Sequence, residues 1–408
     1  MFIAGEASGD LLAAELVAAL REELQRTESR PTLDLQPLRT GLAPRFFGAG
    51  GPSMKAAGVD LAFDLTQHSV IGLSDVLQHY LKFRRFFDQL FHLAVERQPD
   101  AIIGVDYGVF NLRFGHAIRQ YVRKHSGIFQ SWNPKIIQYV SPQVWASREG
   151  RAYRIARDYD LLLCLFPFEK EWYAKRVPRL HVEFVGHSMV DRYSNDGLRQ
   201  PGKEVRTASA EKWAPQLLLL PGSRTNELRR HLPAMLGALK RIQEKQPGLR
   251  ANMVLPSEML AQLAKSMGTP TGVEIQVGGL PAALARADVA VASTGTVTME
   301  CACFGVPAVT LYKTSWINYR IAKAIATVDT ATMPNLLAKE EVYPEFIQHQ
   351  ATPENISRAA LALLGDAHQR AETKAKLAKI IASLGGPGAS RRAARAVAQL
   401  LAGQTAGS

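Results

Sequence analysis

Short apolar runs alternate with helical stretches along nearly the whole chain, and this alternation is the feature that most constrains the fold. Strands joined by helices in this order pair in parallel and bury both faces of their sheet. The apolar runs predicted as strands are residues 2–4, 45–48, 101–105, 135–140, 161–165, 216–220, 251–254, 274–277, 289–292 and 308–312. The sequence therefore predicts an α/β protein built on parallel sheets.

The alternation is interrupted once, by a polar segment rich in Gly, Ser and Pro at residues 193–215. A chain of 408 residues is also longer than one ordinary core, so two domains are expected. We predict two doubly wound, Rossmann-like domains, 1–192 and 216–353, joined by this linker and facing a cleft at the carboxyl ends of their strands. The alanine-rich helical residues 354–408 are expected to pack back on the first domain. The first strand is short and begins at Met1, which is typical of a chain whose natural start lies upstream.

The net charge and the cysteine content indicate which class of partner and which cellular compartment to expect. The net charge of +12 and the pI near 9.6 favour a polyanionic partner, such as phosphorylated substrates or an anionic membrane surface. The basic residues are scattered or paired rather than gathered on one element, so nucleic acid is not expected. Three cysteines in apolar stretches are typical of reduced core thiols in a cytosolic protein. No apolar run reaches the ~18–20 residues of a membrane-spanning helix.

Two motifs of the first domain follow expected strands. GEASGD at 5–10 opens a helix, and its backbone N–H groups and small residues suit an anion or a sugar. Taken alone, however, this turn is more typical of a structural cap formed by Ser8 or Asp10. GVDYGVFN at 104–111 places Asp106 directly after an apolar strand, at the edge of the sheet where ligands bind in such folds.

Two motifs of the second domain predict a phosphate site. PGSR at 221–224 ends the first strand, where Arg224 would pair with the oxygens of a diphosphate. In STGTVTMEC at 293–301, Gly295, Thr296 and Thr298 form a small, hydroxylated helix start that suits phosphate. Glu300 follows one turn later, where a carboxylate can accept hydrogen bonds from both hydroxyls of a ribose.

The remaining chemistry-bearing residues are less specific. His187 in FVGHSMVD follows an expected strand, and a hydrogen-bonded structural histidine is as typical of this position as a catalytic one. The sequence contains no HExxH, no paired CxxC and no DxD-like acidic pair. We therefore expect catalysis without a metal ion and without a cofactor.

Taken together, these motifs resemble the lipid-A-disaccharide synthase family, which are inverting glycosyltransferases with two Rossmann domains of the GT-B type. Each motif alone is weak, but their order and spacing extend over nearly the whole chain. In chain order the motifs are GEASGD, GAGGPSM, SVIGLSDVL, GVDYGVFN, YVSPQVWASR, LFPFEK, FVGH, LLPGSR, STGTVTMEC, MPNLLA and PEFIQ.

The resemblance implies a reaction and a place for it. The family joins UDP-2,3-diacylglucosamine to 2,3-diacylglucosamine 1-phosphate, giving the β-1,6-linked lipid A disaccharide 1-phosphate and UDP. The enzyme would act in the cytoplasm of a Gram-negative bacterium, attached peripherally to the anionic inner-membrane surface. The sequence leaves a monomer and a homodimer both open.

The resemblance also implies roles for individual residues. Asp106 would be the catalytic base, and Arg224 would assist the departure of UDP. The residues expected around the nucleotide are Gly222, Ser223, Arg224, Gly295, Thr296, Thr298 and Glu300. Those expected to contact the donor or acceptor sugar are Glu6, Ser8, Gly9, Asp10, Asn111, Gln143 and His187.

A basic and aromatic stretch at 70–90 is predicted to contact the membrane or the acyl chains of the substrates. The competing interpretation is an ordinary helix facing the core, since the apolar stripe fits both. The residues assigned to this contact are Val70, Leu73, Phe83, Arg84, Arg85 and Phe86.

Two departures from the family pattern bear on specificity. Val109 stands where the family usually has a second aspartate, and Ser147 stands where it commonly has a tryptophan.

Two other functions remain open on the sequence. One is another UDP-sugar enzyme of the same architecture, such as a UDP-N-acetylglucosamine 2-epimerase or a peptidoglycan glycosyltransferase. The other is a nucleotide-binding protein without catalytic activity.

Overall fold

The computed structural model describes residues 1–28, 43–66, 76–125, 127, 131–195 and 214–403. The chain divides into two compact units, Met1–Ser188 with Leu384–Ser408, and Met189–Ser383. Each unit contains its own parallel sheet, as expected. Most of the expected linker, 196–213, lies outside the described residues.

In the described part of the first unit, seven parallel strands lie in the order β3-β2-β1-β4-β5-β6-β7. The chain builds outward from β1 to β3 on one side and then returns to add β4 on the other side. The direction of winding therefore changes between β1 and β4. The strands are β1 (Phe2–Ala4), β2 (Phe47–Gly50), β3 (Asp60–Asp64), β4 (Ala101–Val105), β5 (Lys135–Tyr139), β6 (Leu161–Cys164) and β7 (Val182–Phe184).

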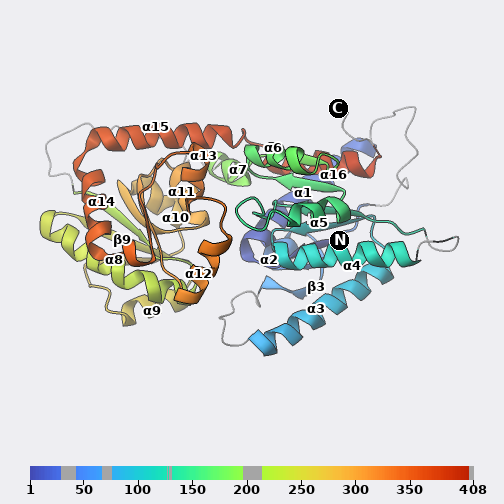
Figure 1. Ribbon diagram of the computed structural model, residues 1–408, viewed down its shortest axis with the longest axis horizontal. Coiled ribbons are helices and arrows are strands. Elements are labelled where there is room, and N and C mark those ends of the chain that lie inside the picture. The colour runs from blue at the N-terminus through green and yellow to red at the C-terminus, as the bar shows by residue number, and fades with distance from the viewer. Residues whose placement is uncertain (29–42, 67–75, 126, 128–130, 196–213, 404–408) are drawn as a thin grey trace. The chain divides into compact units, whose positions relative to one another are not determined.

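Helices cover this sheet, and the last helix of the chain returns to it. α16 (Ala389–Leu401) packs along α1 (Ala7–Glu28), so these distant segments lie side by side (Figure 1). The other helices of the first unit are α2 (Pro52–Ala56), α3 (Val76–Arg97), α4 (Gly108–His125), α5 (Arg151–Asp158) and α6 (Pro167–Arg176).

The second unit repeats the plan with six parallel strands among its described residues, in the order β10-β9-β8-β11-β12-β13. Here the direction of winding changes between β8 and β11. The strands are β8 (Gln216–Leu220), β9 (Arg250–Leu255), β10 (Val273–Val277), β11 (Val289–Ser293), β12 (Ala308–Tyr312) and β13 (Glu345–Ile347).

The helices of the second unit include two that were expected on the first domain. α14 (Pro353–Gly365) packs against α8 (Thr225–Lys245), and α15 (Ala367–Ser383) packs against α11 (Thr296–Cys303) (Figure 1). Only the segment from Leu384 onward belongs to the first unit. The remaining helices are α7 (Ser188–Asn195), α9 (Glu258–Ser266), α10 (Leu280–Arg286), α12 (Trp316–Ile325), α13 (Met333–Ala338) and the 3-10 helix η3 (Gln348–Gln350).

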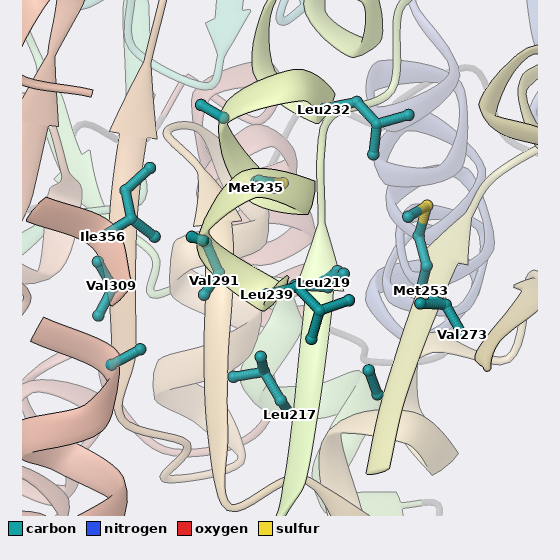
Figure 2. Close-up of a cluster of buried hydrophobic side chains, with 14 of the residues drawn as sticks. Leu217, Leu219, Leu232, Met235, Leu239, Met253, Val273, Val291, Val309 and Ile356 are labelled. Carbon is teal, nitrogen blue, oxygen red and sulfur yellow. The ribbon is translucent and has the colours of Figure 1, made fainter. Parts of the chain in front are cut away.

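The core of the second unit follows from the spacing of apolar side chains, which is two residues in a strand and three or four residues in a helix. Leu217 and Leu219 of β8 lie two residues apart and so point to the same face, toward α8 (Figure 2). There they meet Leu232, Met235 and Leu239, which share one helix face by their spacing of three and four residues. The alternate leucines of β8 are buried on the opposite face. A strand buried on both faces explains the uninterrupted run of four leucines.

Candidate active site

The first candidate site lies where the winding of the first sheet changes direction, between β1 and β4. In doubly wound folds this is the place where ligands bind, outside the carboxyl ends of the strands. The turn after β1 and the turn after β4 are in contact, because a Cβ placed on Gly9 would lie 3.4 Å from the Cβ of Asp106. The backbone N–H of Asp106 donates to the Tyr139 carbonyl at 2.9 Å, which joins the ends of β4 and β5.

Asp106 has the electrostatics of a base. Burial raises the pKa of its carboxyl above the ordinary value, and the nearby Glu6 carboxylate raises it further. Hydrogen bonds from the Tyr107 backbone and the Ser8 side chain act in the opposite direction and favour the charged form. A carboxylate with a raised pKa accepts a proton more readily than an exposed one.

The backbone around Asp106 is held in an uncommon conformation. Asp106 and Tyr107 have φ values of 51° and 48°, and Val140, at the end of the adjacent β5, has a φ of 68°. A β-branched residue in the left-handed region is a genuine outlier, and such strain gathers at functional sites. The strained residues lie at the ends of neighbouring strands, so they mark one place in the fold.

Two buried amides hold this strained turn in place. Asn111 Nδ2 donates to the Asp106 carbonyl at 2.8 Å, and Gln138 Nε2 donates to the same carbonyl at 2.9 Å. Gln138 also donates to the Val140 carbonyl at 3.2 Å. The sequence pointed to Asn111 as a sugar contact, but its side chain is buried and supports Asp106 instead. Gln138 was missed, although a lone amide inside the apolar strand KIIQY is a signal that could have found it.

Asp10 also supports a turn rather than facing a ligand. Its carboxylate is buried and accepts hydrogen bonds from the backbone N–H groups of Gly51, Ser53 and Met54 at 2.7, 2.8 and 3.1 Å. These contacts cap α2 and tie the turn after β1 to GAGGPSM. Of the other residues in the GEASGD turn, Ser8 is exposed and Glu6 is half-buried.

A buried glutamate joins two of the motifs named above. Trp145 Nε1 donates to Glu169 Oε1 at 3.0 Å, and the Phe166 backbone N–H donates to Glu169 Oε2 at 3.1 Å. Burial raises the pKa of Glu169 to about 7. The side chain thus fastens the loop YVSPQVWA to LFPFEK, and on this loop Gln143 is exposed.

His187 lies close to the returning C-terminal segment. Its backbone N–H donates to the Leu384 carbonyl at 3.2 Å, and its ring centroid lies 5.7 Å from that of Phe166. Arg392 of α16 donates from Nε to the Val185 carbonyl at 2.8 Å, which fastens the same segment. The contacts of His187 are therefore typical of a histidine at a packed junction, while its contact with the donor or acceptor sugar stays a prediction.

The second candidate site lies where the winding of the second sheet changes direction, between β8 and β11. The turns after these strands contain Gly222 and Gly295, whose φ values of 125° and 133° are disfavoured for any residue with a side chain. Each turn leads into a helix, α8 and α11 respectively. Two helix N-termini at one edge of the sheet offer backbone N–H groups and partial positive charge to an anion.

Arg224 is the cation of this site. Its side chain is exposed and lies 3.6 Å from Glu227 Oε1. The other oxygen of Glu227 accepts from the Ser223 backbone N–H at 3.0 Å, so the first turn of α8 holds the PGSR turn in shape. The exposed guanidinium can bind an anion placed at the start of α8.

The residues predicted to bind the nucleotide in the turn after β11 and in the start of α11 differ in their exposure. Gly295 and Thr296 are exposed at the helix start, where a phosphate would lie. Thr298 is fully buried, and its hydroxyl donates to the Gly295 carbonyl at 2.7 Å, so it shapes the turn rather than contacting a ligand. Glu300 is half-buried, and its Oε1 accepts from the Tyr193 hydroxyl at 2.8 Å. Burial raises the pKa of Glu300, and the Tyr193 hydrogen bond lowers it.

His231 is a supporting residue that the sequence did not reveal. Its buried ring accepts from the Lys313 backbone N–H at Nε2, at 3.0 Å, and Nδ1 lies 2.8 Å from the Pro221 carbonyl. This arrangement requires a neutral ring with the proton on Nδ1, and burial lowers the pKa of His231 accordingly. The ring thereby connects the PGSR turn to the residue that follows β12.

Comparison with known proteins identifies the family. The family described as lipid-A-disaccharide synthetase matches residues 1–400. A lipid-A-disaccharide synthase of Myxococcus xanthus is 36% identical over 411 residues, covering 98% of this chain and 97% of the relative. One of Geobacter metallireducens is 35% identical over 405 residues, with the same coverage of 98% and 97%. The chain belongs to the lipid-A-disaccharide synthase family.

Solved structures confirm the fold. MurG of Acinetobacter baumannii aligns with a TM-score of 0.53 at 15% identity, covering 98% of this chain and 99% of that one. A UDP-GlcNAc 2-epimerase of Neisseria meningitidis aligns with a TM-score of 0.58 at 13% identity, covering 95% and 97%. At these identities the likeness shows a shared GT-B architecture and nothing about the reaction.

Membership of the lipid-A-disaccharide synthase family confirms the predicted glycosyltransferase, which acts on sugar-nucleotide and lipid-sugar substrates. The epimerase alternative is not favoured, because the epimerase resembles this chain in fold alone.

Among the residues that the structure describes, no group of three His, Cys, Asp or Glu side chains is arranged to hold a metal ion. Within the same residues, no helix combines the length and apolar character that crossing a membrane requires.

The predicted membrane stretch is only partly described, since Val70 and Leu73 lie outside the described residues. Phe86 stacks on Phe63 with ring centroids 4.7 Å apart and packs against the core. Phe86 is half-buried, so part of its ring stays accessible and its contact with a membrane or an acyl chain stays a prediction. The other three described residues of this set are the exposed Arg84 and Arg85 and the half-buried Phe83.

Proposed function

We propose that the protein transfers the diacylglucosaminyl group of UDP-2,3-diacylglucosamine to the 6-hydroxyl of 2,3-diacylglucosamine 1-phosphate. The products would be the β-1,6-linked disaccharide 1-phosphate and UDP. The observation that carries this proposal is Asp106, a carboxylate at the change of winding whose pKa is raised by burial. Family membership supports the two substrate classes, a sugar nucleotide and a lipid sugar.

In this mechanism Asp106 acts on the acceptor. As the acceptor oxygen forms its bond to the anomeric carbon of the donor, Asp106 takes the hydroxyl proton. The bond between that carbon and the UDP oxygen breaks on the opposite face, which inverts the configuration. The proton ends on the carboxylate and the electron pair of the broken bond leaves with UDP, so atoms and charge balance.

The second unit would bind the leaving UDP. Arg224 and the backbone N–H groups at the starts of α8 and α11 would bind the diphosphate and stabilise the charge it gains. Glu300 would accept hydrogen bonds from the ribose hydroxyls through the oxygen that Tyr193 does not contact. The epimerase of Neisseria meningitidis, which shares the fold, was crystallised bound to UDP-GlcNAc, and this supports a UDP-sugar site of the same architecture.

The acylated substrates imply work at a membrane surface. Both carry acyl chains and would be drawn from the cytoplasmic face of the inner membrane, and the net charge of +12 suits its anionic lipids. No step of this mechanism uses a metal ion, so turnover is expected to survive a chelator.

The test is incubation of the protein with both acylated sugars, with product detection by mass spectrometry. Formation of UDP and a disaccharide 1-phosphate in equal amounts, unaffected by EDTA, is the expected result. Each sugar alone serves as the control. Conversion of the UDP-sugar without acceptor would overturn the proposal in favour of an epimerase, and UDP binding without turnover would indicate a non-catalytic protein.

A further inference from the structure

Helix α12 of the second unit presents large apolar side chains to solvent. Trp316, Ile317 and Ile321 are 70%, 65% and 52% exposed. Nine large hydrophobic side chains are exposed among the described residues, and four of them, including Ile325, belong to this one helix. An exposed apolar patch gathered on one element marks an interaction site more often than scattered single residues do.

The apolar side chains form a stripe because of their spacing. Ile317, Ile321 and Ile325 are four residues apart and share one face of the helix. Asn318 and Tyr319, on the other side, are half-buried. The helix begins with a regular cap, since the Ser315 hydroxyl accepts from the Asn318 backbone N–H at 3.3 Å. A well-formed helix thus turns its apolar stripe outward.

The charges beside the stripe are all positive. Arg320 and Lys323 are the ionisable side chains of α12 apart from Tyr319, and residues 313–328 contain no Asp or Glu. The Arg320 guanidinium carbon lies 5.4 Å from the centre of the Trp316 ring. Tryptophan, arginine and lysine are the side chains that anchor proteins at the boundary between lipid tails and headgroups. Apolar residues flanked by cations suit a bilayer whose headgroups are anionic.

α12 is connected to the predicted nucleotide site through its own unit. The helix follows β12 after a short connection that begins at Lys313, and the Lys313 backbone N–H donates to His231. The other nitrogen of that ring lies 2.8 Å from the carbonyl of Pro221 in the PGSR turn. α12 is therefore connected to the edge of the sheet where the UDP of a lipid substrate would bind.

We propose that α12 is a membrane-docking helix, which inserts its apolar stripe into the interfacial layer of a bilayer that contains anionic lipids. This inference rests on the proposed function, since it supplies the surface through which acylated sugars reach the protein. A second copy of the chain fits the apolar stripe of α12 less well than a bilayer does. A two-fold contact through α12 would gather Arg320 and Lys323 of both copies at one interface, and residues 313–328 contain no carboxylate to pair with them.

The test is flotation of the full-length protein with phosphatidylglycerol-containing vesicles and with neutral phosphatidylcholine vesicles. The double variant I317S/I321S is expected to bind the anionic vesicles at least about tenfold more weakly, because two apolar side chains leave the interface. The double variant R320Q/K323Q is expected to lose about tenfold on anionic vesicles and little on neutral ones. Met259→Ser, which changes a 59% exposed side chain on α9 of the same unit, is the matched control and should bind as the wild type does.

Three results would overturn the proposal. One is unchanged vesicle binding by I317S/I321S in a protein whose circular dichroism is unaltered. Another is an equal loss by Met259→Ser, which would make the effect nonspecific. The third is a dimer in analytical ultracentrifugation that I317S/I321S converts to a monomer, which would assign the stripe to a contact between copies. Because flotation needs no turnover, failure of the proposed reaction would leave this readout unaffected.

Discussion

The two units share a doubly wound parallel sheet, yet the places where their winding changes direction are built differently. In the first unit, Asp106, Tyr107 and Val140 adopt left-handed backbone conformations although none is glycine. In the second unit, Gly222 and Gly295 provide the positive φ values, at little steric cost. The first place is held by buried amides around a carboxylate, and the second leaves backbone N–H groups and an arginine at two helix starts.

This difference suits the two tasks that the proposed mechanism assigns to the units. Proton transfer needs one side chain held within a fraction of an ångström, and supporting hydrogen bonds can stabilise a strained backbone to obtain that position. Binding a diphosphate needs several donors around a volume, and glycine turns allow the backbone itself to approach the anion. The predictions below separate these two tasks, beginning with the largest expected effect.

Asp106→Asn should lower kcat by about 10²-fold or more, because the amide keeps the shape of the side chain but cannot accept the acceptor proton. Steady-state kinetics with both acylated sugars measure this loss. His187→Ala is the comparison, and it should retain most of the activity. Wild-type kcat in Asp106→Asn together with an inactive His187→Ala would transfer the role of base to the histidine.

Arg224→Ala should lower kcat/KM by at least about tenfold, since charge-assisted hydrogen bonds to the diphosphate are lost as UDP gains charge. Arg229→Ala removes another exposed arginine of α8 and serves as the control. Equal rates for the two variants would show that Arg224 lies outside the site.

Gln138→Leu should lower kcat by about tenfold, because it removes donors to the carbonyls of Asp106 and Val140 and lets the strained turn shift. The melting temperature will also fall, so the kinetics are compared with UDP affinity measured on the folded protein. A positioning role predicts reduced kcat with unchanged UDP affinity. If only the melting temperature changes, Gln138 is structural.

Glu300→Gln should weaken UDP binding by about threefold to fivefold, roughly 1 kcal/mol, because a neutral amide accepts hydrogen bonds from ribose less strongly than a carboxylate does. Thymidine diphosphate, which lacks the 2′-hydroxyl, should bind both proteins with more similar affinity. Identical UDP affinities in the two proteins would show that Glu300 has only a structural role, through its hydrogen bond with Tyr193.

The central strands could be predicted from the sequence, but of the edge strands in the described part of the chain only β10 (Val273–Val277) was predicted. β4, β8 and β12 occupy the residues expected of them, because a strand buried on both faces reads as a continuous apolar run. β3 (DLAFD) and β7 (VEF) were not foreseen. They lie at the edges of the first sheet, where half-exposed residues do not form such a run.

In the candidate site, the position of a residue at the end of a strand could be predicted, but the direction of its side chain could not. The positions of Asp106 and Arg224 could be predicted, because Asp106 directly follows β4 and Arg224 lies in the turn after β8, each at the edge of its sheet where ligands bind in such folds. Asp10, Asn111 and Thr298 also lie in segments that follow strands, yet each side chain makes hydrogen bonds to backbone groups of a turn. Whether a polar side chain faces a ligand or an adjacent turn depends on contacts distant in sequence, and local pattern does not encode them.

UDP binding measured by calorimetry on two variants tests the division of tasks most directly. If the first unit performs proton transfer and the second holds the nucleotide, Asp106→Asn should bind UDP with the wild-type affinity, while Arg224→Ala should bind it at least about tenfold more weakly. The account is contradicted if Asp106→Asn weakens UDP binding as much as Arg224→Ala does.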